Sequence, residues 1–395
     1  MKSGTRDLPR NKDIVFVTLS EWDGPRRIRH HLANEFAKQG NRLLFIEAYY
    51  TLSKFVKDPD VSKLLQFLRR PREIKKNLFI LSVNPFLPLG EFSSIISRVN
   101  WTIARFFMRR KMNALGFKDP LLVVFAYNAS SIVGHMGERR SVYFCNDAFD
   151  KLYKQEWLRR KVVSLEQRLI KKADAVITVS EKLTKEKSRF ARKITTVHHG
   201  VEYDLFEETL RNAAVPEELS AIKKPVVGYS GVVRHIIDLD LLEYVASSRP
   251  EWSIVIVGPV TESDRQYYDK VDALKKRGNV HFLGTKPSDE IPRYISQFDV
   301  CLLPYALDEV STYYTAPLKF YEYLAAGKPV VSTVGPKGGE ESLVLNVSTK
   351  EAFLAAIEKA FTLTSPRQVK ARKEEARKNS WKERVREIEE FIATV

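Results

Sequence analysis

The sequence predicts two α/β domains, each built on a mainly parallel sheet. The chain has 395 residues, which is too long for one compact core and suits two domains of roughly 150–200 residues each. Apolar runs with strand character alternate with helical patterns through both halves, which is typical of parallel α/β domains. We therefore expect one domain over residues 1–205, a second over 206–378, and a C-terminal helix over 379–395.

Composition indicates an ordered protein that works in a reducing compartment. Hydrophobic residues make up 44% and charged residues 29% of the chain, proportions of a globular rather than a disordered protein. Cys145 and Cys301 each lie in an apolar run, so we expect buried free thiols and a cytoplasmic location. Residues 1–13 lack the apolar core of a signal peptide, and no stretch approaches the roughly 20 apolar residues of a membrane helix.

The first domain opens with strand Asp13–Leu19, helix Arg27–Lys38 ended by Gly40, and strand Arg42–Ile46. Further strands are predicted at Leu78–Val83, Leu121–Ala126, Ser141–Cys145 and Ala175–Val179. A helix between the last two places its apolar residues on one face, the pattern of a helix packed on a sheet: Leu158, Val162, Leu165 and Leu169.

The second domain repeats the alternation. Its predicted elements are strand Pro225–Gly228, helix Leu239–Ser247, strand Ser253–Val257 and strand Val280–Gly284. Serines are good N-cap residues, so we expect helices to begin after Ser288, after Ser348 with Glu351 as a capping box, and after Ser380 with Glu383. The last helix carries an apolar stripe of Trp381, Val385, Ile388, Ile392 and Val395.

The segment from Phe298 to Thr333 contains the main candidate site. A buried strand stops at Pro304, Pro317 suits the first turn of a helix, and Gly327 marks its end. Lys319 and Glu322 then lie three residues apart on one side of the first turns. Open α/β sheets bind ligands at this place, and a carboxylate there can accept hydrogen bonds from both hydroxyls of a ribose. The alternative is that Glu322 is an ordinary solvated helix residue.

This segment resembles the nucleotide-sugar site of GT-B glycosyltransferases, especially the retaining group 1 or family 4 enzymes. Glu322, in EYLAAGKPVV, matches the second glutamate of their Glu, seven residues, Glu motif. The first glutamate is replaced by Tyr314. The resemblance implies two Rossmann-like domains that face a cleft, with a C-terminal helix that crosses back to the N-terminal domain.

The glycine loop GYSGVVRHIIDLD is similar to the loop that holds the diphosphate in this family. Family members have an arginine directly after the glycine, but here Val232 follows Gly231 and the nearby charges are Arg234 and His235. The resemblance therefore implies a donor site made of Gly231, Arg234, Tyr314, Thr315, Ala316, Pro317, Leu318, Lys319 and Glu322.

The turn SEWDGPRRIRHHLA resembles that of polysaccharide-building enzymes, including teichuronic-acid-type transferases. Gly24, Arg26 and Arg27 would line the acceptor or phosphate side, with Arg29 adding positive charge nearby. The alternative is that these arginines only solvate the helix. His30 and His31 lie further along and are expected to pack.

Asp147 follows the predicted strand Ser141–Cys145, at a position that lines the cleft in the family. We take it as the candidate catalytic residue, either as general base for the acceptor hydroxyl or as a hydrogen-bond partner of the donor sugar. A helix N-cap is the alternative role.

We predict no metal and no cofactor. Two Asp-X-Asp patterns, Asp58–Asp60 and Asp238–Asp240, have the form that holds divalent ions in other transferases, but helix capping explains both. Zinc-ligand spacings and the Gly-X-Gly-X-X-Gly fingerprint are absent from the sequence.

The charge distribution points to an anionic partner of the first half. Residues 1–200 carry 39 Lys and Arg against 19 Asp and Glu, whereas residues 201–395 carry 26 against 30. Between Lys54 and Phe117, aromatic residues alternate with arginines. A buried helix with basic ends, a membrane-interface segment and a nucleic-acid site all fit, and we favour the interface because nucleic-acid motifs are absent.

The sequence thus predicts a metal-independent glycosyltransferase, of the hexosyl type and retaining, at the inner face of the cell membrane. Its donor would be a nucleotide sugar, with UDP favoured, and its acceptor a lipid-linked sugar or a polysaccharide. Two alternatives stay open: a non-catalytic protein that binds anionic polymers, and a sugar-nucleotide epimerase.

Overall fold

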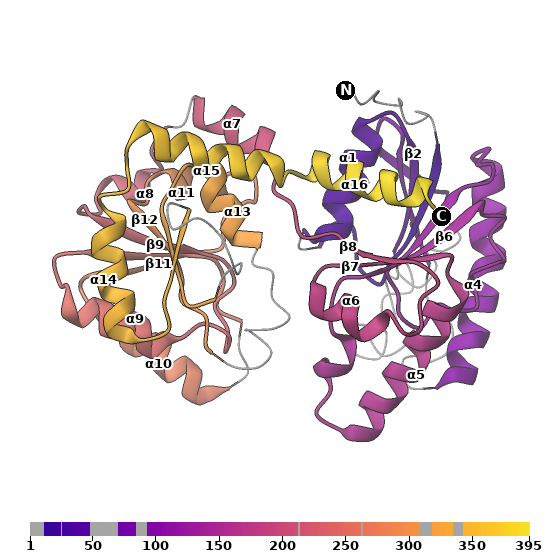
Figure 1. The fold of residues 1–395 in the computed structure, drawn as a ribbon, viewed down its shortest axis with the longest axis horizontal. Helices are drawn as coiled ribbons and strands as arrows, with labels where there is room; N and C mark the ends of the chain where they lie inside the picture. The colour runs from indigo at the N-terminus through magenta and orange to yellow at the C-terminus, as the bar shows by residue number, and fades with distance from the viewer. Residues whose placement is uncertain are drawn as a thin grey trace. The chain divides into compact units, whose positions relative to one another are not determined.

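The computed structural model describes residues 12–24, 26–47, 70–83, 93–211, 214–261, 264–307, 318–334 and 343–395 (Figure 1). Contacts divide the chain into two compact units, Met1–His198 with Arg384–Val395, and His199–Glu383. Both units are α/β, and each is described by itself. In the described residues, no helix is both long enough and apolar enough to cross a bilayer.

The first unit contains an eight-stranded sheet in the order β3-β4-β2-β1-β5-β6-β7-β8. All neighbouring strands are parallel except β3 and β4. The strands are β1 (Asp13–Val17), β2 (Arg42–Glu47), β3 (Arg72–Lys75), β4 (Leu78–Ser82), β5 (Leu121–Val124), β6 (Arg140–Cys145), β7 (Ala175–Thr178) and β8 (Ile194–Thr196). Apolar side chains on both faces of the central strands are buried, as in sheets covered by helices on both sides.

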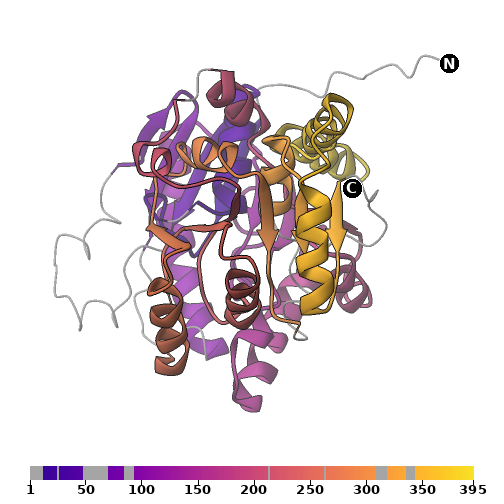
Figure 2. The same cartoon turned by 90° about the vertical axis from the view of Figure 1, so that its left-hand side faces the viewer.

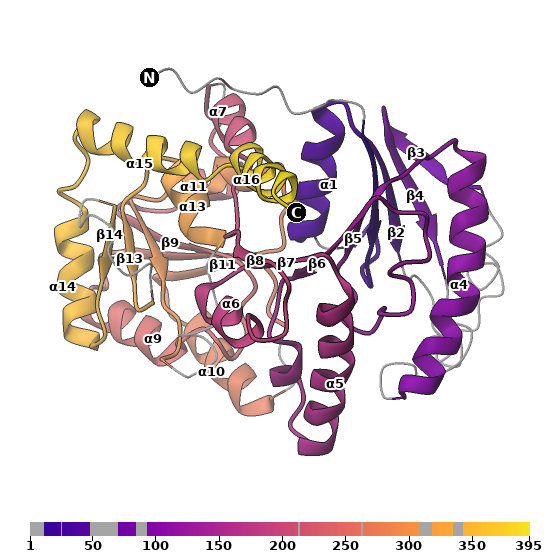
Figure 3. The same ribbon diagram turned by 45° about the vertical axis from the view of Figure 1, so that its right-hand side comes forward.

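The helices of this unit are α1 (Ile28–Lys38), α4 (Ser94–Ala114), α5 (Glu156–Lys172) and α6 (Glu181–Lys187), with a 3-10 turn η2 (Phe149–Leu152). Figure 3 shows α1 and α4 on opposite sides of the sheet. The predicted apolar face of α5 is buried along its length. On α4 the buried residues are Ser97, Asn100, Trp101, Ala104, Met108 and Met112, which leaves its opposite face in solvent.

The second unit contains a six-stranded parallel sheet in the order β11-β10-β9-β12-β13-β14. The strands are β9 (Val226–Ser230), β10 (Ser253–Val257), β11 (Val280–Gly284), β12 (Val300–Leu303), β13 (Val330–Ser332) and β14 (Val344–Asn346). The helices are α7 (Tyr203–Arg211), α8 (Glu217–Ser220), α9 (Leu239–Ser248), α10 (Arg265–Lys275), α11 (Ile291–Ser296), α13 (Leu318–Ala325), α14 (Lys350–Ala360) and α15 (Pro366–Lys378). The gold helix α14 lies against β13 (Figure 2).

The C-terminal helix α16 (Trp381–Ala393) begins next to Val201, which lies near the start of the second unit. Val201 bonds to this region through its amide to the Asn379 carbonyl (3.0 Å) and through its carbonyl to the Trp381 amide (3.1 Å). Residues from His199 therefore already belong to the second unit, a few residues earlier than the sequence suggested. Arg384–Val395 belong to the first unit, where Glu389 pairs with Lys12 at 3.6 Å.

Two cap predictions were wrong and one was right. α11 begins after Glu290 rather than Ser288, and α14 begins after Thr349, whose hydroxyl accepts the Ala352 amide at 3.2 Å. Neighbouring Ser348 and Thr349 are both capable caps, so the sequence alone does not choose between them. Ser380 does cap, because its hydroxyl accepts the Glu383 amide at 3.4 Å.

Strand β3 was not predicted because its residues, Arg-Glu-Ile-Lys, are mostly charged and exposed on an antiparallel edge. The prediction of buried free thiols is confirmed for Cys145 and Cys301.

Candidate functional site

The candidate site lies where the strand order of the second sheet reverses. From β9 the chain adds β10 and β11 on one side, then returns to place β12 on the other side. Ligands of open α/β sheets bind outside the carboxyl ends of the strands at such a switch point. The residues that follow β9 and β12 here are Gly231 and Pro304–Tyr305, and α13 follows β12 along the chain.

Helix α13 presents Lys319 and Glu322 at this edge. Phe320, Tyr323 and Leu324 are buried and hold the helix on the sheet. The Tyr323 hydroxyl accepts a hydrogen bond from the Ser230 amide at 2.8 Å, which ties α13 to the end of β9. On the other side of the helix, Lys319 Nζ lies 3.1 Å from Glu322 Oε2, with the two side chains 27% and 16% exposed.

Gly231 lies close to Lys319 of this pair. A Cβ at Gly231 would stand 2.6 Å from the Tyr229 hydroxyl and 3.3 Å from Lys319 Cε. Gly258, directly after β10, packs against the backbone of Gly231. A Cβ at Gly258 would be 2.0 Å from the Gly231 carbonyl oxygen. These close approaches leave space only for glycine and bring backbone to the edge of the site.

Arg234 lies on the loop that follows β9, three residues after Gly231. Its carbonyl accepts hydrogen bonds from the Tyr267 hydroxyl (2.6 Å) and the Ile237 amide (2.7 Å), which fix the loop, while its side chain is exposed. Burial raises the pKa of Tyr305, the Glu322 carboxylate raises it further, and Arg234 opposes the change. Arg234 and Glu322 therefore both act on the same buried tyrosine.

The structure thus brings together Gly231, Lys319 and Glu322, with Leu318 as the first residue of α13, and it places Arg234 on the loop that follows Gly231. The other four, Tyr314, Thr315, Ala316 and Pro317, lie outside the described residues. Val232, which replaces the family's arginine, exposes 43% of its surface.

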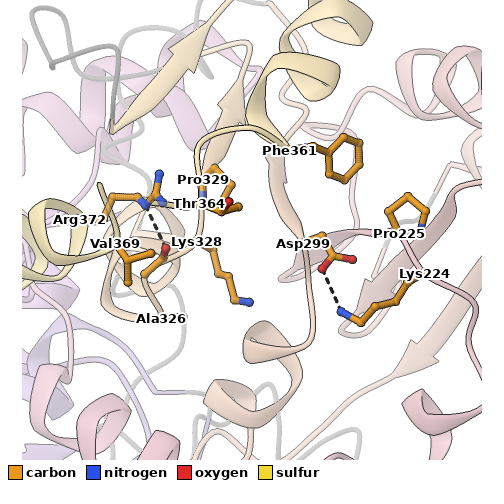
Figure 4. A pocket seen from close by; sticks show the side chains of 11 residues that line it. Lys224, Pro225, Asp299, Ala326, Lys328, Pro329, Phe361, Thr364, Val369 and Arg372 are labelled. Atoms are coloured by element: carbon orange, nitrogen blue, oxygen red, sulfur yellow. Dashed lines mark hydrogen bonds and ion pairs between the residues drawn. The ribbon is translucent and has the colours of Figure 1, made fainter. Parts of the chain in front are cut away.

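A cavity of about 630 Å³ lies at the amino ends of β9, β12 and β13 instead (Figure 4). Three of its four charged side chains have partners: Lys224 pairs with Asp299 at 2.9 Å, and Arg372 Nε donates to the Gly327 carbonyl at 3.0 Å. We place the candidate site at the carboxyl ends because the switch point and the converging loops are there.

The first unit has its own switch point, between β1 and β5. Gly24, Arg26 and Arg27 lie between β1 and α1, and the Arg26 guanidinium is 5.0 Å from the centre of the Trp22 ring. The Trp22 amide donates to Glu47 at 2.6 Å, and the Ser82 hydroxyl donates to the same carboxylate at 2.7 Å. Burial raises the pKa of Glu47. Glu47, which sequence reasoning missed, thus positions the loop that carries Arg26.

His30 is a core residue, as the sequence suggested. Its Nδ1 accepts the Arg27 amide at 3.0 Å and its Nε2 donates to the Glu21 carbonyl at 3.0 Å, the pattern of a neutral imidazole. Burial lowers the pKa of His30 to about 4.

Arg29 is a buried cation whose charge interacts with the charge of Asp147. Arg29 is only 6% exposed, its guanidinium lies 5.8 Å from the centre of the Phe125 ring, and its buried Nε has no hydrogen-bond partner among the described residues. Burial and the Arg27 charge lower the pKa of Arg29 to about 10, against the pull of Asp147. Asp147 is exposed, and its Oδ1 accepts the Ala148 amide at 2.8 Å, but the N-cap of η2 is Ala148.

The backbone of Asp147 is hydrogen-bonded to a buried polar cluster that the sequence did not reveal. Cys145 Sγ donates to the Asp147 carbonyl at 3.3 Å. Beneath it, Glu166 accepts hydrogen bonds from the Tyr143 hydroxyl (2.6 Å) and from Lys187 Nζ (2.7 Å). A satisfied buried network of this kind makes the strand end rigid.

The Asp-X-Asp pair at Asp238 and Asp240 is accounted for without a metal. Asp238 caps α9 by accepting the Leu241 amide at 2.9 Å, and Asp240 pairs with Lys270 at 2.7 Å. The described residues contain no group of three or more side chains that could hold a metal ion. Asp58 and Asp60 lie outside the described residues.

The family model described as "Glycosyl transferases group 1" matches residues 224–362, which include the whole cluster from Gly231 to Glu322. This part of the second unit is similar to the group 1 glycosyltransferase domain. TuaH of Bacillus subtilis, named for glycosyl transfer in teichuronic acid biosynthesis, is 35% identical over 185 residues. That match covers 44% of this chain and 44% of TuaH, so it spans less than half of the relative's length.

Solved structures give the fold of the whole chain. HepE of Anabaena, in complex with UDP and glucose, is 17% identical and covers 98% of this chain and all of its own, with a TM-score of 0.62. An E. coli structure named for trehalose-6-phosphate and bound with UDP-2-fluoro glucose is 14% identical, covers 96% and 99%, and has a TM-score of 0.64. Starch synthase IV of Arabidopsis thaliana, bound to ADP and acarbose, is 10% identical, covers 98% and 99%, and has a TM-score of 0.62. The chain has the GT-B fold.

Proposed function

We propose that this protein is a glycosyltransferase of cell-surface polysaccharide synthesis, which moves a sugar from a nucleotide diphosphate to a lipid-linked or glycan acceptor. One observation carries the proposal. The Lys319–Glu322 pair lies beside Gly231 at the switch point of the unit that is similar to the group 1 glycosyltransferase domain. The resemblance to TuaH supports the cell-surface setting.

On the donor side, Glu322 would accept hydrogen bonds from the ribose hydroxyls, and Lys319 and Arg234 would neutralise the diphosphate. The Lys319–Glu322 pair does not oppose this, because partly exposed ion pairs contribute only about 0–1 kcal/mol. Hydrogen bonds to a charged acceptor contribute about 1.5–3 kcal/mol, so a ribose can share the carboxylate. Backbone amides at the start of α13 would add a partial positive charge.

A UDP-hexose is the donor we favour. HepE and the E. coli structure, by their titles, hold UDP or a UDP-sugar, although the Arabidopsis enzyme holds ADP. We propose retention of the anomeric configuration because Glu322 matches the motif of a retaining family.

On the acceptor side, Asp147 is the proposed catalytic residue. For the configuration to be retained, the acceptor hydroxyl would attack the anomeric carbon from the face on which the bond to the diphosphate breaks. Asp147 would take the hydroxyl proton, and the nucleoside diphosphate would leave with its charge neutralised by Lys319 and Arg234. Arg26, Arg27 and buried Arg29 supply positive charge on the same unit, which suits an acceptor that carries phosphate.

We also propose that the enzyme is peripheral to the inner face of the membrane. The excess of 39 basic over 19 acidic residues in positions 1–200 supports attraction to anionic lipid. The solvent face of α4 supports contact with the bilayer, because Ile95 and Phe106 are 75% and 65% exposed there among arginines.

The test is transfer from labelled UDP-, GDP- and dTDP-sugars to membranes of a bacterium that makes such polymers. We expect the parent to transfer label from one donor and Glu322→Ala to transfer none. An epimerase would instead convert the nucleotide sugar into an isomer without an acceptor. A non-catalytic protein would give neither product, and either result would overturn the proposal.

A further inference from the structure

A second, smaller cavity lies in the first unit, and none of the candidate donor or catalytic residues lines it. It measures about 340 Å³ and is bounded by α4, α5 and the segment that follows β5. Four cationic side chains line it, Arg98 and Arg105 from α4 and Arg168 and Lys172 from α5. None of the described residues that line it is acidic.

Two of these cations hold the floor of the cavity, and two are available. Arg105 donates to the Ser131 carbonyl at 3.2 Å, and Lys172 donates to the Ser130 carbonyl at 2.9 Å. Arg98 and Arg168 are exposed, and no carboxylate of the described residues pairs with either. Four like charges around one small space repel one another, so an anion placed among them would be held strongly.

The floor of the cavity also has an unused hydrogen-bonding group. The Ser131 hydroxyl is buried and has no partner among the described residues. By contrast, Asn128 accepts two hydrogen bonds. Its carbonyl accepts one from the Ser97 hydroxyl at 3.0 Å, and its side-chain oxygen accepts one from Trp101 at 3.3 Å. A buried hydroxyl without a partner is costly unless a ligand or water completes it.

The surroundings select the kind of anion. Ile95, Val99 and Phe106 are exposed on α4 at a spacing that places them on one face, next to Arg98 and Arg105. Basic and apolar residues side by side on a surface helix are typical of contact with lipid headgroups and acyl chains.

We propose that this cavity binds the phosphate of an anionic lipid headgroup while the apolar residues of α4 enter the bilayer. Arg98 and Arg168 would contact the phosphate oxygens, and the Ser131 hydroxyl would donate to one of them. The inference deepens the proposed membrane location, and it does not depend on which sugar is transferred.

The chain offers a matched pair of variants for the test. Arg98→Gln with Arg168→Gln removes two charges that line the cavity, whereas Arg110→Gln with Lys171→Gln removes two exposed charges from the same helices outside it. Both proteins lose the same net charge, so general attraction to an anionic surface falls equally. Binding of the full chain to vesicles of phosphatidylcholine with phosphatidylglycerol is measured by co-sedimentation.

We expect the cavity variant to bind these vesicles about tenfold or more weakly than the matched control, because only the cavity variant loses the charge-assisted hydrogen bonds to the phosphate. Equal binding by the two variants would overturn the proposal. Phe106→Ser should weaken vesicle binding but leave unchanged the thermal shift given by glycerol 3-phosphate. If Phe106→Ser binds vesicles as the parent does, α4 does not enter the bilayer and that part of the proposal is wrong. If the parent shows the thermal shift with glycerol 3-phosphate but does not bind vesicles, the anion is a free phosphate compound and the lipid assignment is wrong.

Two further measurements distinguish lipid binding at this cavity from donor binding and from nucleic-acid binding. The cavity variant should keep its thermal shift with UDP, so loss of lipid binding with intact donor binding identifies a failure at the cavity alone. If the parent ignores vesicles but binds a single-stranded polynucleotide that the cavity variant does not bind, the anionic partner is nucleic acid and the lipid proposal fails.

Discussion

Gly231 shows how the absence of one side chain shapes the donor site. A Cβ there would meet the Tyr229 hydroxyl and Lys319 Cε. We expect Gly231→Ala to push Lys319 away from the site and to weaken donor binding by about 1–3 kcal/mol, the usual cost of overpacking. Gly278→Ala is the control, because nothing lies within 4 Å of its Cβ position. Calorimetry with the preferred nucleotide sugar decides, and equal affinity of the two variants would count against the site.

Asp147 is the residue on which the proposed chemistry depends. If it is the general base, Asp147→Asn should lower kcat by about 10²–10⁴ while donor affinity and melting temperature stay unchanged. The control is Asp150→Asn, on the following 3-10 turn, because it makes the same Asp-to-Asn replacement at a residue that is not the proposed base. A kcat of Asp147→Asn within a factor of two or so of the Asp150→Asn value would remove Asp147 from the mechanism.

At the scale of one element, His30 makes the packing of α1 dependent on pH. Its folded pKa of about 4 lies below the ordinary value of 6.5. As pH falls from 6.5 to 4, the unfolded chain takes up a proton that the folded chain does not, so the free energy of unfolding should fall by about 1.4 kcal/mol per pH unit. Above pH 6.5 the full contribution is present.

Urea unfolding across this range tests the assignment. His30→Gln should show a shallower loss of stability between pH 6.5 and 4 than the parent, and His31→Gln should keep the parent's slope. Parallel pH profiles for the parent and His30→Gln would show that His30 is not held neutral.

Elements with a continuous apolar run could be predicted from the sequence, and those fixed by neighbours could not. β10 has the predicted bounds because all five of its residues are buried. β11 also has the predicted bounds, although only Val280 of that strand is fully buried. Lys319 and Glu322 could be found because helical spacing alone places them together. The burial of Arg29 depends on Phe125, which is far away in sequence, so the local pattern suggested positive charge near the helix start or a solvated arginine, and not a buried one.

At the scale of the whole molecule, positive charge replaces a metal in our account. Lys319, Arg234 and the start of α13 provide that charge near the proposed diphosphate. We therefore expect sugar transfer to continue in excess EDTA at nearly the parent rate. Loss of activity in EDTA that magnesium or manganese restores would instead give Asp58 and Asp60 a role in binding an ion.

The central claim is that Glu322 on α13 holds the ribose of a nucleotide donor, and direct calorimetry of UDP binding tests it most simply. Glu322→Gln keeps the shape of the side chain but loses the charged acceptor, so affinity should fall by about 1–3 kcal/mol, or roughly 5- to 150-fold. Glu351→Gln, at the start of α14 in the same unit, is the control and should bind as the parent does. Equal UDP affinity for Glu322→Gln and the parent would contradict the account.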